Sequence, residues 1–188
     1  YVRRLIDALS AGSLIWFTTG SAVAAPGLLF EGVPYSAGNL NIATSGAQNP
    51  AVNARAGATL DLTDFNISTS GFLSSGIRVS GSNANLIGYC YSSPCGSTVS
   101  TFKDGSYGIV ATKESAVNIR GVEIHTKGGQ HTYEQEGNQY VRGSHALVSE
   151  DLSNVTKESV SIKTTGDFSG GLLSQNPGYH SFHPIKME

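Results

Sequence analysis

Apolar and polar residues alternate through residues 58–79 of this chain. The apolar positions are Leu60, Leu62, Phe65, Ile67, Ile77 and Val79. A two-residue period is that of a β-strand with one buried face. The alternation breaks at Thr63-Asp64 and again across residues 70–75, where Gly, Ser and Asp favour turn conformations. The stretch therefore predicts three short strands joined by corners.

The same pattern recurs in the chain without gaps. Moving the stretch back by 25 residues, or forward by 57 or 95, superimposes apolar residues, threonines and glycines on their own kind. Equivalent positions in four copies are Ile42, Ile67, Ile124 and Ile162. Units of this size bury their apolar face by stacking on one another. We therefore expect an all-β solenoid, a right-handed parallel β-helix of about five turns, with these four isoleucines in one interior stack.

The repeat sets the expected domain organisation. The predicted turns cover residues 40–54, 60–79, 86–111, 117–149 and 155–174. Two insertions interrupt them, Cys90 to Lys103 and Gly128 to Gly143. The β-helical domain is assigned to residues 25–174, of which residues 27–38 are expected to be irregular. Beyond Ser174 the alternation stops, so residues 175–188 are expected to form an irregular tail, truncated or aberrant.

Residues 1–24 differ from all that follows. Arg3-Arg4 precedes an apolar run, and Ala22-Val23-Ala24 offers an A-x-A motif. These are the parts of a secretory signal peptide, with cleavage expected after Ala24. An N-terminal cap helix remains an alternative because Asp7 interrupts the apolar run, which is also too short to span a bilayer.

Composition and charge narrow the function. A hydrophobic content of 39% is enough for a real core. Charged residues make up 14% of the chain and the net charge is −2. A nucleic-acid partner is not expected, because such binding needs a basic surface.

Residues 57–71, GATLDLTDFNISTSG, with SGI at 75–77 and partial copies at 115–126 and 159–174, resemble pertactin-like passenger domains of bacterial autotransporters. The resemblance covers roughly residues 40–174. It implies export through the periplasm to the cell surface or outer membrane, or secretion. It also implies an adhesin or virulence role whose partner is a host-surface protein or glycan. That family carries a C-terminal outer-membrane β-barrel, which we expect in the full-length protein because this sequence leaves no room for it.

The two cysteines, Cys90 and Cys95, form a close isolated pair. In an exported protein such a pair indicates a local disulfide, and the intervening Ser-Pro with the following Gly supplies the turn. Free thiols remain an alternative. The spacing is not that of a C-x-x-C redox motif, and a zinc site would need further ligands. No metal site is expected at the histidines, although His180 and His183 have a spacing that metals can use.

Parallel β-helices also carry polysaccharide lyases and hydrolases, so the carboxylates need a test. A glycoside hydrolase requires two carboxyl groups facing one another across a cleft. Asp61 is expected on an outward strand face and Asp64 at a corner, and the other turns do not repeat either acid. We expect no catalytic residue and no cofactor. A polysaccharide-cleaving enzyme remains the second hypothesis and a non-functional gene fragment the third.

The insertions are the remaining candidates for function, because binding usually resides in loops held by a rigid scaffold. Aromatic residues with polar neighbours suit contact with a protein or a glycan. The candidate interaction residues are Tyr89, Tyr91, Phe102, His131, Tyr133, Tyr140 and Arg142. The alternative is that both insertions are tolerated surface excursions. The preferred function is that of an exported, non-catalytic adhesin.

Overall fold

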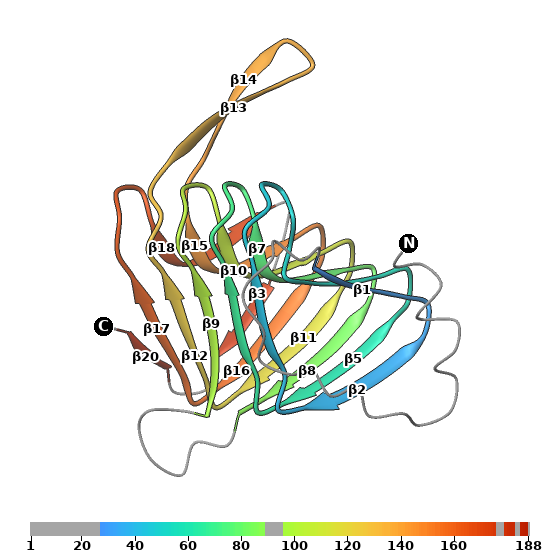
Figure 1. The fold of residues 1–188 in the computed structure, drawn as a ribbon. Helices are drawn as coiled ribbons and strands as arrows, with labels where there is room; N and C mark the ends of the chain where they lie inside the picture. The colour runs from blue at the N-terminus through green and yellow to red at the C-terminus, as the bar shows by residue number, and fades with distance from the viewer. Residues whose placement is uncertain (1–26, 89–95, 176–178, 183–184, 188) are drawn as a thin grey trace.

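The computed structural model describes residues 27–88, 96–175, 179–182 and 185–187, and these ranges contain β-strands and no helix (Figure 1). In the same ranges no helix is long and apolar enough to cross a bilayer. Sheet A consists of β1 (Leu28–Glu31), β4 (Val52–Arg55), β7 (Ser75–Ser80), β10 (Tyr107–Thr112), β15 (His145–Glu150) and β18 (Gly170–Gln175).

The other two large sheets have the same number of strands. Sheet B consists of β2 (Pro34–Gly38), β5 (Thr59–Thr63), β8 (Asn83–Ile87), β11 (Ala116–Arg120), β16 (Asn154–Glu158) and β19 (Tyr179–Phe182). Sheet C consists of β3 (Asn41–Thr44), β6 (Asn66–Thr69), β9 (Ser97–Thr101), β12 (Val122–Thr126), β17 (Val160–Thr164) and β20 (Ile185–Met187).

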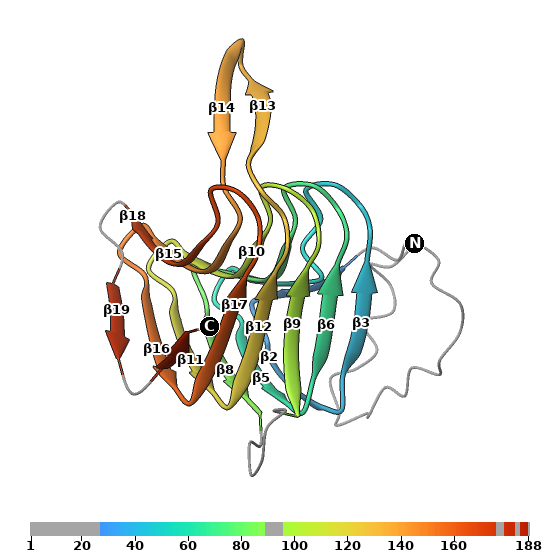
Figure 2. The same ribbon diagram turned by 90° about the vertical axis from the view of Figure 1, so that its left-hand side faces the viewer.

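Every neighbouring pair within these three sheets is parallel, and each strand pairs with the strands one turn before and one turn after it. Figures 1 and 2 show the three sheets wound around a shared interior. The chain is therefore a parallel β-helix, as the repeat predicts. It completes six turns rather than five, because each sheet has six strands.

The interior stack has the predicted register. In sheet C, Ile42 pairs with Ile67, and Ile124 with Ile162. Val99 completes the column between Ile67 and Ile124. All five belong to or pack against one apolar core that draws residues from the three sheets.

The extra turn comes from the two segments expected to be irregular. Residues 27–38 contain β1 and β2, which pair with β4 and β5. The tail contains β19 and β20, which pair with β16 and β17. These strands are short, and backbone pairing onto an existing turn does not require a long apolar alternation, so the sequence pattern missed them.

The first predicted insertion is shorter than expected, because residues 97–101 form β9. Ser97, Val99 and Thr101 all point inward and are buried. The Ser97 hydroxyl accepts a hydrogen bond from the Phe65 backbone N–H at 3.1 Å. Two of the three inward residues are polar, so an apolar period could not identify the strand.

The corners between sheets B and C are made by a single residue with positive φ. These residues are Asn39, Asp64, Gly121 and Ser159. The exception is the connection from β8 to β9, where residues 88–96 take the place of the one-residue corner. Asp64 is thus a corner residue, as predicted.

The repeated glycine before the sheet A isoleucines is required by the interior. A Cβ atom at Gly76 would lie 2.3 Å from Val99 Cγ1, and one at Gly108 would lie 2.6 Å from Ile124 Cγ2. Both distances are shorter than side-chain packing allows. Glycine here lets sheet A turn two consecutive residues toward the core.

Replacing Leu152 with glycine is expected to raise the free energy of unfolding by about 0.5–1 kcal/mol. Leu152 has a φ of 62°, which is strained for a residue with a Cβ, and its side chain is exposed. Urea unfolding followed by circular dichroism measures the change. Leu152→Ala keeps the strained conformation and is the matched control; an equal gain from both variants would contradict the prediction.

Candidate interaction surface

The second insertion forms a β-hairpin that projects from the β-helix (Figures 1 and 2). β13 (His131–Gln135) and β14 (Asn138–Arg142) pair antiparallel and lie between β12 and β15. Glu136 and Gly137 join them with φ values of 52° and 76°. Two successive positive φ values fit the two-residue turns that hairpins favour. The insertion is therefore an ordered element.

One face of the hairpin carries its aromatic residues. Tyr133 and Tyr140 are directly opposed, and their rings stack with centroids 5.7 Å apart. His131 and Arg142, also opposed, lie two residues closer to the base on the same face. Tyr140 is 44% exposed.

The base of this face is fixed against earlier turns. The His131 ring stacks on Phe72 at 5.1 Å, and the Arg142 guanidinium lies 3.6 Å above the centre of the Tyr107 ring. The Gly129 N–H donates to Asp104 Oδ1 at 2.7 Å, just before the hairpin begins. These contacts direct the tyrosine face toward the corners that join sheet C to sheet A.

Those corners present further aromatic rings, each with a lysine. Lys103 Nζ lies 5.3 Å from the centre of the Phe72 ring, and Lys127 Nζ lies 5.1 Å from that of Phe102. Phe72 and Phe102 are 41% and 43% exposed. We call this surface the hairpin shelf and define it as Phe72, Phe102, Lys103, Lys127, Tyr133 and Tyr140.

Titratable groups gather beneath the hairpin on the outer face of sheet A. Burial raises the pKa of Tyr107 and of Glu150 and lowers the pKa of His145. The charge of Arg142 opposes the shift of the pKa at Tyr107 and at Glu150. Arg142 was expected to contact a ligand, but its stacking on Tyr107 makes it the residue that positions the hairpin.

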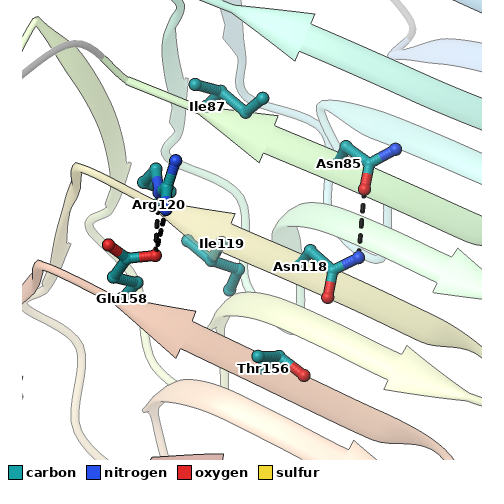
Figure 3. Close-up of a pocket in the computed structure, with 7 residues that line it drawn as sticks. All are labelled: Asn85, Ile87, Asn118, Ile119, Arg120, Thr156 and Glu158. Atoms are coloured by element: carbon teal, nitrogen blue, oxygen red, sulfur yellow. Dashed lines mark hydrogen bonds and ion pairs between the residues drawn. The ribbon is translucent and has the colours of Figure 1, made fainter. Parts of the chain in front are cut away.

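A shallow groove of about 270 Å³ lies on the outer face of sheet B (Figure 3). Its lining residues are Asn85, Ile87, Asn118, Ile119, Arg120, Thr156 and Glu158. The Asn118 amide donates to Asn85 Oδ1 at 3.0 Å, and Arg120 Nε donates to Glu158 Oε2 at 2.9 Å (Figure 3). Most of the polar groups in the groove are thus engaged with one another.

The carboxylates are placed much as expected. Asp61 is a half-buried residue on the outer face of sheet B, where its Oδ1 accepts a hydrogen bond from the Asn85 amide at 2.6 Å. Glu158 is the one carboxylate among the groove-lining residues. Glu134 is exposed on the hairpin and Glu136 lies in its turn.

The two insertions do not form a common site. The first precedes β9, whereas the second follows β12. Because the strands of sheet C are parallel, these positions lie at opposite edges of the sheet. Tyr89, Tyr91, the pair Cys90 and Cys95, and the predicted cleavage site at Ala24 lie outside the described residues, so these predictions stay open.

The sequence analysis missed Phe72, Lys103 and Lys127. Phe72 and Lys103 do break the pattern of small residues at corners, which was the available signal. Their proximity to the hairpin depends on the stacking of turns.

For a metal site, no group of three or more His, Cys, Asp or Glu side chains comes together within the described ranges. His125 lies on the outer face of sheet C, with its Nε2 2.8 Å from Glu123 Oε1. His183 is outside the described residues, and the side chain of His180 is not described.

No protein-family model, curated protein or solved structure matches this chain.

Proposed function

We propose that this chain is the binding module of an exported bacterial surface protein, with the hairpin shelf as its contact surface. In its finer form the proposal is that of a pertactin-like autotransporter passenger acting as an adhesin. The signal-like residues 1–24 support export, and the parallel β-helix supports the resemblance at the level of the fold.

The observation that carries the proposal is the ordered hairpin on a rigid support. Hairpins of two strands are marginal in water by themselves. Here the ring contacts of His131 and Arg142 hold the base in place. The hairpin consequently presents Tyr133 and Tyr140 in a fixed orientation, which reduces the entropy lost on binding.

Binding is preferred to polysaccharide cleavage because of the groove on sheet B. A hydrolase needs two carboxyl groups about 5–9.5 Å apart across the substrate. The groove lining supplies Glu158 alone, which is paired with Arg120. Release of uronate from pectin by the purified protein would favour the enzyme hypothesis.

Removing the hairpin should abolish adhesion. In the test variant, Asn-Gly replaces residues 132–141, because a two-residue turn can join the opposed pair His131 and Arg142. Beads coated with the unaltered protein are expected to adhere to cultured epithelial cells, and beads coated with the variant to fall to the level of albumin-coated beads.

The matched control is Arg120→Gln with Glu158→Gln, which alters the sheet B groove and leaves the hairpin intact. These beads are expected to adhere as the unaltered protein does. Equal adhesion with and without the hairpin, or no adhesion by the unaltered protein, would refute the proposed function.

A further inference from the structure

The hairpin shelf is positively charged in a chain whose net charge is −2. Lys103 and Lys127 lie on successive corners, and His131 and Arg142 lie at the hairpin base. The nearby carboxylate of Asp104 accepts the Gly129 N–H. Glu134 is directly opposite Gln139, one residue from the tyrosine pair, and so lies on the other face of the hairpin. The shelf therefore favours an anion.

The two lysines are positioned by rings. Each ammonium lies within about 6 Å of the centre of an aromatic ring, the range of a cation–π contact. Neither lysine forms a salt bridge with another residue in the described ranges. Each charge is thus located beside an exposed ring and available to a ligand.

This alternation of rings and charges suits a sugar polymer better than a folded protein. A stable protein interface buries about 800 Å² on each partner around a dehydrated core depleted of charge. The shelf instead places an ammonium over each of its two phenylalanines. An aromatic face offers a weakly negative surface to the C–H groups of a sugar ring, while an adjacent ammonium can pair with an acidic substituent.

We infer that the hairpin shelf binds an acidic polysaccharide, one whose sugars carry carboxylate or sulfate groups. This inference rests on the proposed function and names the class of ligand. Phe72, Phe102 and the stacked pair Tyr133 and Tyr140 contact sugar rings. Lys103 and Lys127 pair with the acidic groups.

The test uses the full chain and three fluorescein-labelled polymers: heparin, which is sulfated, polygalacturonate, which carries carboxylates alone, and neutral dextran. Fluorescence anisotropy is recorded at low salt and at 0.3 M NaCl. Saturable binding is expected for at least one acidic polymer and not for dextran. Added salt should weaken it several-fold, because the pairs are exposed. The acidic polymer that binds identifies the group recognised.

Two pairs of variants separate the shelf from general charge. Lys103→Gln with Lys127→Gln, and separately Phe72→Ala with Phe102→Ala, are each expected to raise Kd by about five- to tenfold. The charge control is Lys113→Gln with Lys163→Gln, both exposed and away from the shelf. The aromatic control is Phe168→Ala, which is 75% exposed on the corner after the hairpin. Both controls should change Kd by less than about twofold, and thermal unfolding verifies that all variants are folded.

Three outcomes would overturn the inference: no saturable binding to either acidic polymer, equal losses in the shelf and control variants, or equal competition by poly-glutamate, which would indicate an acidic peptide. The bead assay separates this failure from that of the proposed function. Hairpin-dependent adhesion that neither polymer inhibits would reject the acidic polysaccharide and keep the adhesin. Loss of both would reject both.

Discussion

Replacing Ile124 with alanine is expected to lower the free energy of unfolding by about 3 kcal/mol. Ile124 is fully buried in β12 and lies between Val99 and Ile162 in the interior stack. The substitution removes apolar contacts on both sides and leaves a cavity that neighbouring turns cannot fill without moving whole strands. Urea unfolding followed by circular dichroism measures the loss.

Ile42→Ala is the matched control, because Ile42 belongs to the same column but is only partly buried in the first turn. Its loss should be about 1 kcal/mol, since less apolar area leaves water. If both substitutions cost the same, the stack would not be the source of stability.

Replacing Lys157 with methionine is expected to stabilise the protein by about 2 kcal/mol at pH 7. Lys157 is fully buried in β16, in register with Ile119 of the preceding turn. Burial lowers the pKa of Lys157 to about 8. At pH 7 the lysine is therefore charged in the native state, where its charge is desolvated. Methionine has a similar length without the charge.

The gain should depend on pH in a defined direction. Between pH 8 and about pH 10.5 the unfolded lysine keeps a proton that the native lysine has lost, so the stability of the unaltered protein rises through this range. Lys157→Met lacks this rise. Its advantage should be full below pH 8 and small near pH 10.5, as urea unfolding at pH 7 and pH 10 can measure. Lys163→Met, at an exposed position, should show no advantage at either pH; a gain for Lys157→Met that stays constant with pH would contradict the assignment.

The fold was predictable where each turn contributes one apolar residue to each interior column. Ile42, Ile67, Ile124 and Ile162 recur because a stacked interior demands similar side chains at equivalent positions. The rule failed at β9, where Ser97 and Thr101 are buried. A hydroxyl that bonds to the backbone of a neighbouring turn can replace an apolar group, and a hydrophobic pattern does not register it.

The candidate site was predictable only in part. The hairpin interrupts the repeat, so residues 128–143 were recognisable as an insertion. Its partner Phe72 lies on another turn, 59 residues earlier than His131 in the chain. Such contacts follow from the register between turns, which local spacing does not encode. The role predicted for Tyr89 and Tyr91 stays a prediction.

The pairing of each strand with only the preceding and the following turn has a consequence for biogenesis. Hydrogen bonds between turns join residues only 24–41 positions apart. A polypeptide that emerges from a secretion pore in linear order can therefore acquire its final structure coil by coil, each completed coil serving as the template for the next. Directional growth of this kind could draw the remaining chain outward without any chemical energy source at the cell exterior.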